Sequence, residues 1–226
     1  MARGVLQNPA RFECLTVLSI LTGMSRKEIC VSGVRQFDEA AIVPKMLEVF
    51  RAKGWQGSSM QDLAQASQVQ RGSLYHAFGS KQALFLRAFD LYAQRFERKL
   101  QTAWRTADGA SDADAAAVLQ GFFDVALSNM CGRPAHGCLT TRTAMELQAD
   151  DGPIRQRLQQ FLQGLQAQLA QRLDRPDART QLRLPPQTTA QTVLTFTRGL
   201  AVMERIQRDR AQLHAQTQAF VQLLLR

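Results

Sequence analysis

The segment QRGSLYHAFGSK, residues 70–81, concentrates hydrogen-bonding side chains in a short stretch with little apolar content. Arg71 can donate two parallel hydrogen bonds to the edge of a guanine, and Gln70 can pair in the same way with an adenine. Apolar residues recur about one helical turn apart and would hold one face of a helix against a core, which leaves the polar groups on the other face. These apolar residues are Val69, Leu74 and Phe78. The pattern predicts a short helix that reads DNA in the major groove.

The polar groups divide into two predicted classes of DNA contact. Residues at the N-terminal end of a recognition helix reach base edges, and a glycine there lets the backbone approach closely. The predicted base-reading residues are Gln70, Arg71, Gly72 and Ser73. Donors farther along the segment, and an upstream helix N-terminus that can attract an anion, are suited to phosphates. The predicted phosphate contacts are Ser58, Ser59, Tyr75, His76 and Lys81.

Two preceding helices must position this segment. Asp38 is a suitable N-cap for a first helix, and Gly54 follows its cationic last turn as a left-handed stop. Ser59 can cap a second helix, with Asp62 three residues later in a carboxylate version of the capping box. Three short helices separated by tight turns therefore occupy residues 38–78, which is the pattern of a helix-turn-helix.

The remaining chain is also predicted to be helical. A long amphipathic helix runs from Lys81 to about Trp104, and five further helical periods come after it. These cover roughly residues 113–130, 139–148, 153–174, 187–206 and 209–225. No stretch shows sustained alternation of apolar and polar residues, so we predict an all-α fold with an N-terminal three-helix head and a larger helical body.

The predicted domain boundaries depend on these patterns. Residues 34–80 form the helix-turn-helix domain, and residues 81–226 form the connecting helix and the body. Residues 1–33 show no amphipathic repeat that continues into the first helix of the head. They are expected to be either a flexible arm or an upstream extension absent from the native product.

Composition favours a polyanionic partner and an intracellular location. The formal net charge is +9, which suits nucleic acid or another anionic surface. The four cysteines are too few and too scattered for a disulfide framework, so reduced thiols in the cytoplasm are expected. The apolar run at residues 14–24 is too short for a membrane span and lacks a signal-peptide cleavage site.

The same segment argues against an enzyme. Tyr75 and His76 are adjacent on a helix and diverge by about 100°, which is a poor arrangement for a nucleophile and its base. No paired carboxylates and no phosphate-binding loop stand out elsewhere, so neither catalytic residues nor a cofactor is predicted.

A longer motif, MQDLA followed by V-x-R-G-S-L-Y-H-x-F-x-S-K-x-x-L, extends from Met60 to Leu84. It resembles the N-terminal domain of TetR-family transcriptional regulators, and the resemblance covers about residues 34–90. The resemblance implies a DNA-binding head, a fourth connecting helix, and a helical body that binds a small molecule and dimerises. It also matches Lys81 to a phosphate-binding lysine. Two departures are Gln68, where the family usually has glycine, and Pro44 in the first helix.

A second stretch, PAHGCLTTRTAMEL, resembles the segment GCL-x-x-N-x-A-x-E of a subset of the same family, with Thr143 at the asparagine position. Cys138 precedes a predicted helix start, where the helix dipole and nearby basic residues would lower a thiol pKa. Two interpretations stay open: a sensor of oxidants or electrophiles, and a small buried apolar residue. Cys131, His136 and Cys138 do not fit a zinc spacing, so no metal site is predicted.

The body is expected to hold a ligand pocket and a dimer interface. Aromatic and methionine side chains suit an adaptable apolar ligand. The candidate pocket residues are Phe122, Phe123, Met130, Met145, Phe161, Phe196 and Met203. The last two predicted helices resemble the family's dimer-forming pair, and their candidate contacts are Val193, Phe196, Leu200, Met203, Leu213, Phe220, Leu223 and Leu224.

The combined prediction is a cytoplasmic homodimer that represses transcription from a palindromic operator. Two heads about one turn of DNA apart multiply affinity and specificity, and an inducer, a small molecule or an electrophile of unknown identity, would change their separation. The alternatives are a DNA-binding protein that senses no ligand, because pocket and core residues look alike in a sequence, and an activator.

Overall fold

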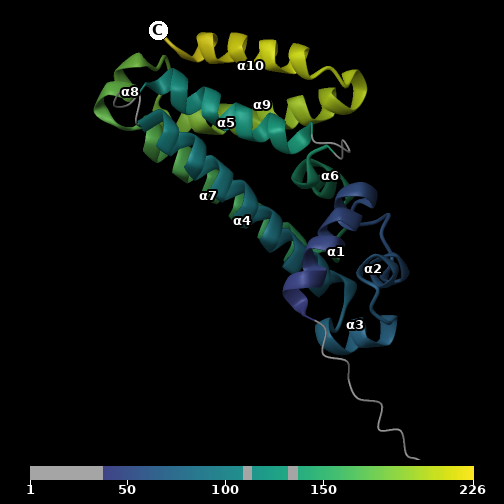
Figure 1. The fold of residues 1–226 in the computed structure, drawn as a ribbon. Coiled ribbons are helices and arrows are strands. Elements are labelled where there is room, and N and C mark those ends of the chain that lie inside the picture. Colours follow the sequence, from purple (N-terminus) through teal and green to yellow (C-terminus); the bar gives the residue numbers. More distant parts are fainter. Residues whose placement is uncertain (1–37, 109–113, 132–136) are drawn as a thin grey trace, which may run out of the picture. The chain divides into compact units, whose positions relative to one another are not determined.

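The structure is a computed structural model that describes residues 38–108, 114–131 and 137–226, and Figure 1 shows helices throughout these ranges. The described ranges contain no strand, and their one element of β pairing is an isolated bridge between Leu182 and Leu225. The all-α prediction is therefore confirmed. The predictions made for residues 1–33 lie outside the described residues.

Three helices form the head: α1 (Glu39–Lys53), α2 (Met60–Ser67) and α3 (Arg71–Phe78). The expected caps are present. The Asp38 side chain accepts a hydrogen bond from Ala40 N, and Ser59 and Asp62 form a reciprocal capping box at the start of α2. Gly54 ends α1 with a φ of 82°. Gln68 takes a left-handed conformation with a φ of 59° in the turn before α3, at a cost of about 1 kcal/mol relative to glycine.

Seven helices form the rest of the described chain. They are α4 (Lys81–Asp108), α5 (Ala115–Met130), α6 (Leu139–Glu146), α7 (Gly152–Leu173), α8 (Pro176–Gln181), α9 (Pro186–Gln207) and α10 (Arg210–Leu224). Six of them match the predicted helical periods. The short helix α8 was not predicted, because six residues are too few to show an amphipathic repeat.

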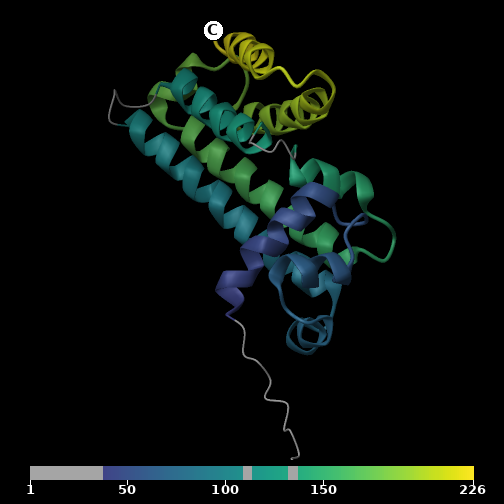
Figure 2. The ribbon, with the colours of Figure 1, turned by 45° about the vertical axis from the view of Figure 1, so that its right-hand side comes forward.

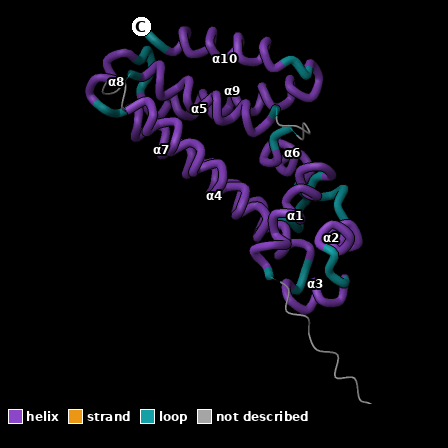
Figure 3. The backbone as a smooth tube through the Cα atoms, viewed as in Figure 1, coloured by secondary structure: helices purple, strands orange, loops and turns teal. Residues whose placement is uncertain are grey.

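Helix α4 links the head to the body. Its first half packs against α1, and its later turns lie alongside α5 and α7 (Figure 2). Helix α9 packs against α7, and α10 packs mainly against α5 (Figure 3). The long helix therefore contacts both the head and the body.

A series of aromatic contacts runs along α4 from the head into the body. Phe85 meets Phe50 edge to face at 5.0 Å between ring centroids, and Phe89 meets Phe161 of α7 at 5.6 Å. Phe96 continues the series toward α5. These rings are almost fully buried, so the core is continuous from α1 to α7. No helix in the described part of the chain is long and apolar enough to cross a membrane.

Candidate nucleic-acid interface

Helix α3 is anchored by one face and open on the other. Leu74 is fully buried, and Val69 and Phe78 are partly buried against the same core. The helix contains no acidic residue, and its N-cap, Gln70, makes no side-chain capping bond. The division into an apolar anchor and an outward polar face is the arrangement expected of a helix that enters a DNA groove.

The predicted base-reading residues lie together at the N-terminal end of α3. Gln70, Arg71 and Gly72 are exposed, and Ser73 is half-buried. The Arg71 guanidinium lies 5.4 Å from the centre of the Tyr75 ring, one turn farther along. This contact restricts the arginine side chain and leaves its N–H groups available for hydrogen bonds. Their use in base reading stays a proposal, supported by position and exposure.

Gly72 has a property that the sequence did not reveal. A Cβ atom at this position would meet nothing within 4 Å, so the fold itself does not require glycine there. Gly79 also has open space, but its φ of 76° is one that favours glycine. The open space leaves room at Gly72 for an external surface to approach the helix, and this use of the position stays a proposal.

Tyr75 and His76, two of the predicted phosphate contacts, are exposed on α3, with 40% of Tyr75 accessible. Lys81, a third predicted phosphate contact, is half-buried and makes contacts within the head. Its Nζ donates hydrogen bonds to Trp55 O at 2.8 Å and Ser58 O at 2.9 Å, and it lies 4.2 Å from the centre of the Trp55 ring. Burial lowers the pKa of Lys81. This lysine holds the turn before α2 rather than pointing outward.

The two serines before α2 also depart from the prediction. Ser58 is buried, and its hydroxyl donates to Trp55 O at 3.0 Å, so it is not offered to a phosphate. The Ser59 hydroxyl is engaged with Asp62. The carboxylate of Asp62 itself occupies the N-terminus of α2 and pairs with Lys53 at 2.5 Å. The anion site predicted at this helix start is therefore already filled by a side chain of the protein.

Two paired side chains of helix α6 connect the body to the head through hydrogen bonds to its backbone. Arg142 Nε lies 2.9 Å from Glu146 Oε1, one turn along the helix. The Arg142 guanidinium donates to the carbonyls of Ala52 and Lys53 at 2.8 and 2.5 Å, at the C-terminal end of α1. Glu146 Oε2 accepts from the backbone N–H groups of Trp55 and Gln56.

We call this pair, Arg142 and Glu146, the α6 clasp. A Cβ atom at Gly54 would lie 2.2 Å from Glu146 Oε1, so the clasp also explains why the residue after α1 is a glycine. Sequence reasoning noted the motif that contains Glu146 but assigned it no role. The i,i+4 spacing of an arginine and a glutamate was the available signal.

Cys138 lies at the start of α6 and is buried, with 6% of its surface exposed. Burial alone would raise the pKa of this thiol. The Arg198 guanidinium and hydrogen bonds from Thr140 and Thr141 outweigh that effect, and the net result is a lowered pKa. Arg198 Nη1 lies 3.7 Å from the sulfur and 2.5 Å from Thr140 Oγ1. The cysteine also borders a pocket of about 450 Å³ between α6 and α9.

The seven predicted pocket residues differ in how deeply they are buried. Phe122, Phe123, Met130 and Phe161 are almost fully buried in the core. Phe196 and Met203 are partly buried against it, and Phe196 stacks on Phe220 with 3.9 Å between centroids. Met145 is 78% exposed and borders the pocket beside Cys138. Aromatic and methionine side chains satisfy core packing and pocket lining equally well, so a pocket shared by these residues stays a prediction.

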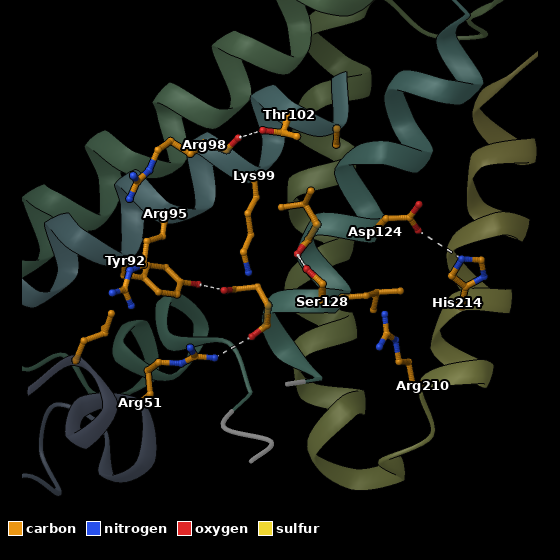
Figure 4. Close-up of a pocket in the computed structure, with 15 residues that line it drawn as sticks. Arg51, Tyr92, Arg95, Arg98, Lys99, Thr102, Asp124, Ser128, Arg210 and His214 are labelled. Atoms are coloured by element: carbon orange, nitrogen blue, oxygen red, sulfur yellow. Dashed lines mark hydrogen bonds and ion pairs between the residues drawn. The ribbon is translucent and has the colours of Figure 1, made fainter. Parts of the chain in front are cut away.

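A groove of about 970 Å³ lies elsewhere, bordered by α1, α4, α5 and α10 (Figure 4). We call it the basic groove, because six basic residues line it: Arg51, Arg95, Arg98, Lys99, Arg210 and His214. None of the seven predicted pocket residues lines it. Its one acidic residue, Asp124, lies 3.4 Å from His214.

Most residues predicted for a dimer interface are buried or partly buried within the single chain. Val193, Leu200, Leu213 and Leu224 are buried, and among the eight named residues only Leu223 is highly exposed, at 71%. Val202 and Ile206, on the outer face of α9, are the exposed apolar residues that the prediction missed. They share one face of α9 with Thr195 and Gly199. This helical spacing is visible in the sequence and could have indicated the exposed face.

Within the described ranges, no group of three or more histidine, cysteine or acidic side chains is placed to hold a metal ion. His136, one of the three residues considered for a metal, lies outside those ranges.

Comparison with known proteins identifies relatives of both parts of the chain. A family model described as bacterial regulatory proteins of the tetR family matches residues 46–88, and one described as the tetracyclin repressor-like C-terminal domain matches residues 115–220. The HTH-type transcriptional regulator YezE of Bacillus subtilis (strain 168) is 38% identical over 60 residues, which are 26% of this chain. The match spans 31% of that relative, less than a third of its length.

Two further similarities extend over most of the chain. The HTH-type transcriptional repressor DhaR of Mycobacterium sp. (strain GP1) is 25% identical over 178 residues, covering 76% of this chain and 84% of DhaR. A cysteine mutant of the TetR-family regulator CifR, solved with 26-base-pair operator DNA, superposes with a TM-score of 0.73 at 22% identity. That alignment covers 84% of this chain and 98% of CifR, and it establishes the likeness of fold.

Proposed function

The chain belongs to the TetR family of bacterial regulatory proteins, and we propose that it is a transcriptional repressor that binds double-stranded operator DNA as a homodimer. The observation that carries the proposal is the exposed, acid-free polar face of α3, backed by a fully buried Leu74. The family and fold are those of transcription regulators rather than of enzymes. The protein acts in the cytoplasm, where it has access to the chromosome.

The domain assignment has the same basis. Residues 34–80 form the DNA-binding domain, and residues 81–226 form the connecting helix and the body that dimerises and responds to ligand. Gln70, Arg71 and Ser73 read base edges, and Gly72 allows the backbone to approach. Tyr75 and His76 contact the flanking phosphates.

Dimerisation uses the outer face of α9. Thr195, Gly199, Val202 and Ile206 form an exposed stripe whose side chains are small or apolar, and Gly199 has open space where a Cβ would lie. A second copy of the chain, related by a twofold axis, can approach such a stripe closely. Leu223 on α10 is a further exposed apolar residue. Two heads then face a palindromic operator with half-sites about one turn of DNA apart.

Release from DNA depends on the body. A ligand weakens operator binding only if its affinity is higher for a dimer whose two heads do not match the spacing of the operator half-sites. The α6 clasp, α4 and the Arg51–Asn129 hydrogen bond all connect body and head. An electrophile is one such signal, because Cys138 has a lowered thiol pKa and borders a pocket.

The DNA-binding proposal is tested by selecting binding sites from a random double-stranded library and measuring affinities for the selected palindrome. Arg71→Ala is expected to lose about 1–3 kcal/mol and to relax the preference at one base position per half-site. Equal weakening of selected and random DNA would show that Arg71 does not read a base. Failure of the wild-type protein to enrich any palindrome would refute the proposal as a whole.

The electrophile route is tested by treating the protein with N-ethylmaleimide and measuring operator affinity before and after. The wild-type protein is expected to lose affinity, and Cys138→Ser is expected to keep it. The half-buried Cys131, whose pKa is raised by burial and by Glu204, provides a second variant, Cys131→Ser, that should respond like the wild type. Identical responses of all three proteins would remove Cys138 from the mechanism.

A further inference from the structure

The basic groove has a charge pattern that the DNA-binding head does not explain. Arg95, Arg98 and Lys99 lie on one face of α4, and Arg210 and His214 lie one turn apart on α10. Figure 4 shows the Lys99 side chain extending from α4 toward α5. Within the described ranges, no carboxylate forms an ion pair with the four arginine and lysine residues on these two helices.

The floor of the groove is less polar than its rim. Leu47, Val125 and Leu127 are buried residues that border it. A groove of about 970 Å³ has room for a molecule of drug size, and its lining combines cationic side chains with apolar ones. This combination suits a molecule with an apolar part and an anionic group.

One end of the groove carries a hydrogen-bond network that joins the head to the body. Arg51 of α1 donates to the carbonyl of Asn129 on α5 at 3.1 Å, and Asn129 Nδ2 donates to the Tyr92 hydroxyl at 2.8 Å. The Nε atom of Arg51 is buried and has no hydrogen-bond partner. Burial raises the pKa of Tyr92, and its hydroxyl accepts the Asn129 hydrogen bond as a neutral phenol.

We propose that the basic groove binds an amphipathic organic anion, such as a carboxylate, sulfonate or phosphate on an apolar body, and that this anion is the effector of operator binding. The inference rests on the proposed repressor function. Lys99, with Arg95 on the same face of α4, neutralises the anionic group, and the apolar part packs against Ala103 and the exposed edge of Val125. Because Arg51 belongs to α1, an anion that competes with the Asn129 carbonyl for this guanidinium changes how the head is held.

The experiment uses two fluorescent probes that differ in one group. 8-Anilinonaphthalene-1-sulfonate carries a sulfonate, and N-phenyl-1-naphthylamine is its uncharged parent. Binding of each is measured with the wild-type protein, with the double variant Arg95→Gln/Lys99→Gln, and with Arg105→Gln as a matched control. Arg105 is an exposed arginine of α4 that does not border the groove. Thermal denaturation confirms that all three proteins are folded.

The double variant is expected to bind the sulfonate at least tenfold more weakly and the uncharged probe within twofold of the wild type. Arg105→Gln should match the wild type with both probes. An unchanged sulfonate affinity in the double variant, or an equal loss for both probes, would refute the anion site.

Coupling to DNA is measured with the selected palindrome. The sulfonate should weaken operator binding by the wild type, and the operator should weaken sulfonate binding by the same factor. If the double variant lost operator affinity with no probe present, the groove would serve the DNA backbone, and the proposal would be wrong. If the wild type bound no palindrome, the proposed function would fail, while the probe comparison would still decide the anion site.

Discussion

The carboxylate of Glu146 accepts a hydrogen bond of 2.6 Å from the backbone N–H of Trp55, which joins α6 of the body to the turn that precedes α2 of the head. The same carboxylate pairs with Arg142, which in turn donates to the last carbonyls of α1. The clasp thus satisfies backbone groups of the head with side chains of the body.

Replacing Glu146 with glutamine is expected to destabilise the protein by about 1–3 kcal/mol, because a charge-assisted bond is lost and the half-buried Arg142 keeps its charge. Chemical denaturation measures the loss, and hydrogen exchange of the Trp55 and Gln56 amides should accelerate. Glu39→Gln breaks an exposed ion pair with Arg87 and is a suitable control, since such pairs contribute about 0–1 kcal/mol. Equal effects of the two changes would contradict the importance of the clasp.

Gly72→Ala separates stability from DNA binding. The added methyl group meets open space, and alanine favours a helix over glycine by about 1 kcal/mol, so thermal stability should stay the same or rise. Operator affinity should fall, because the methyl group lies where DNA approaches. Gly79→Ala is the comparison: its positive φ predicts a loss of stability of about 1 kcal/mol. An unchanged operator affinity in Gly72→Ala would show that DNA does not approach this position closely.

Lys81→Met tests whether this lysine serves the head or the DNA. Two carbonyls, of Trp55 and Ser58, lose their donor, so we expect a loss of about 1–3 kcal/mol in the free energy of unfolding. Lys45→Met removes an exposed lysine of α1 and should cost little. If stability were unchanged and the salt dependence of operator binding fell by about one unit of slope, Lys81 would be a phosphate contact after all.

The capping carboxylate of Asp62 makes the head sensitive to acid. Hydrogen bonds from Lys53 and Ser59 lower the pKa of Asp62 from 3.8 to about 2. A lowered pKa in the folded state means that the added stability is fully present above pH 3.8 and is lost as the pH falls toward 2. NMR titration of the carboxyl group should give a midpoint near 2. Asp62→Asn should remove this part of the pH dependence of stability. A wild-type midpoint near 4 would show that the pKa of Asp62 is not lowered.

Much of the head was predictable because its signals are local. The caps at Asp38 and Ser59, the left-handed stop at Gly54 and the one-turn spacing that buries Leu74 depend on residues close in sequence. Helical periodicity likewise predicted most helices of the body. A matched motif with fixed spacing then identified the class of protein, because recognition residues must keep their positions on one helix.

The regulatory features depend on residues far apart in the chain, and the tertiary structure alone decided them. Lys81 donates to carbonyls 23 and 26 residues earlier, and Glu146 meets an amide 91 residues away. The basic groove takes its residues from four helices. A sequence shows which residues are basic or apolar, but it does not show which of them are buried in the core or already paired with another group. That is why core and pocket residues look alike in the sequence, and why the basic groove was not predicted from it.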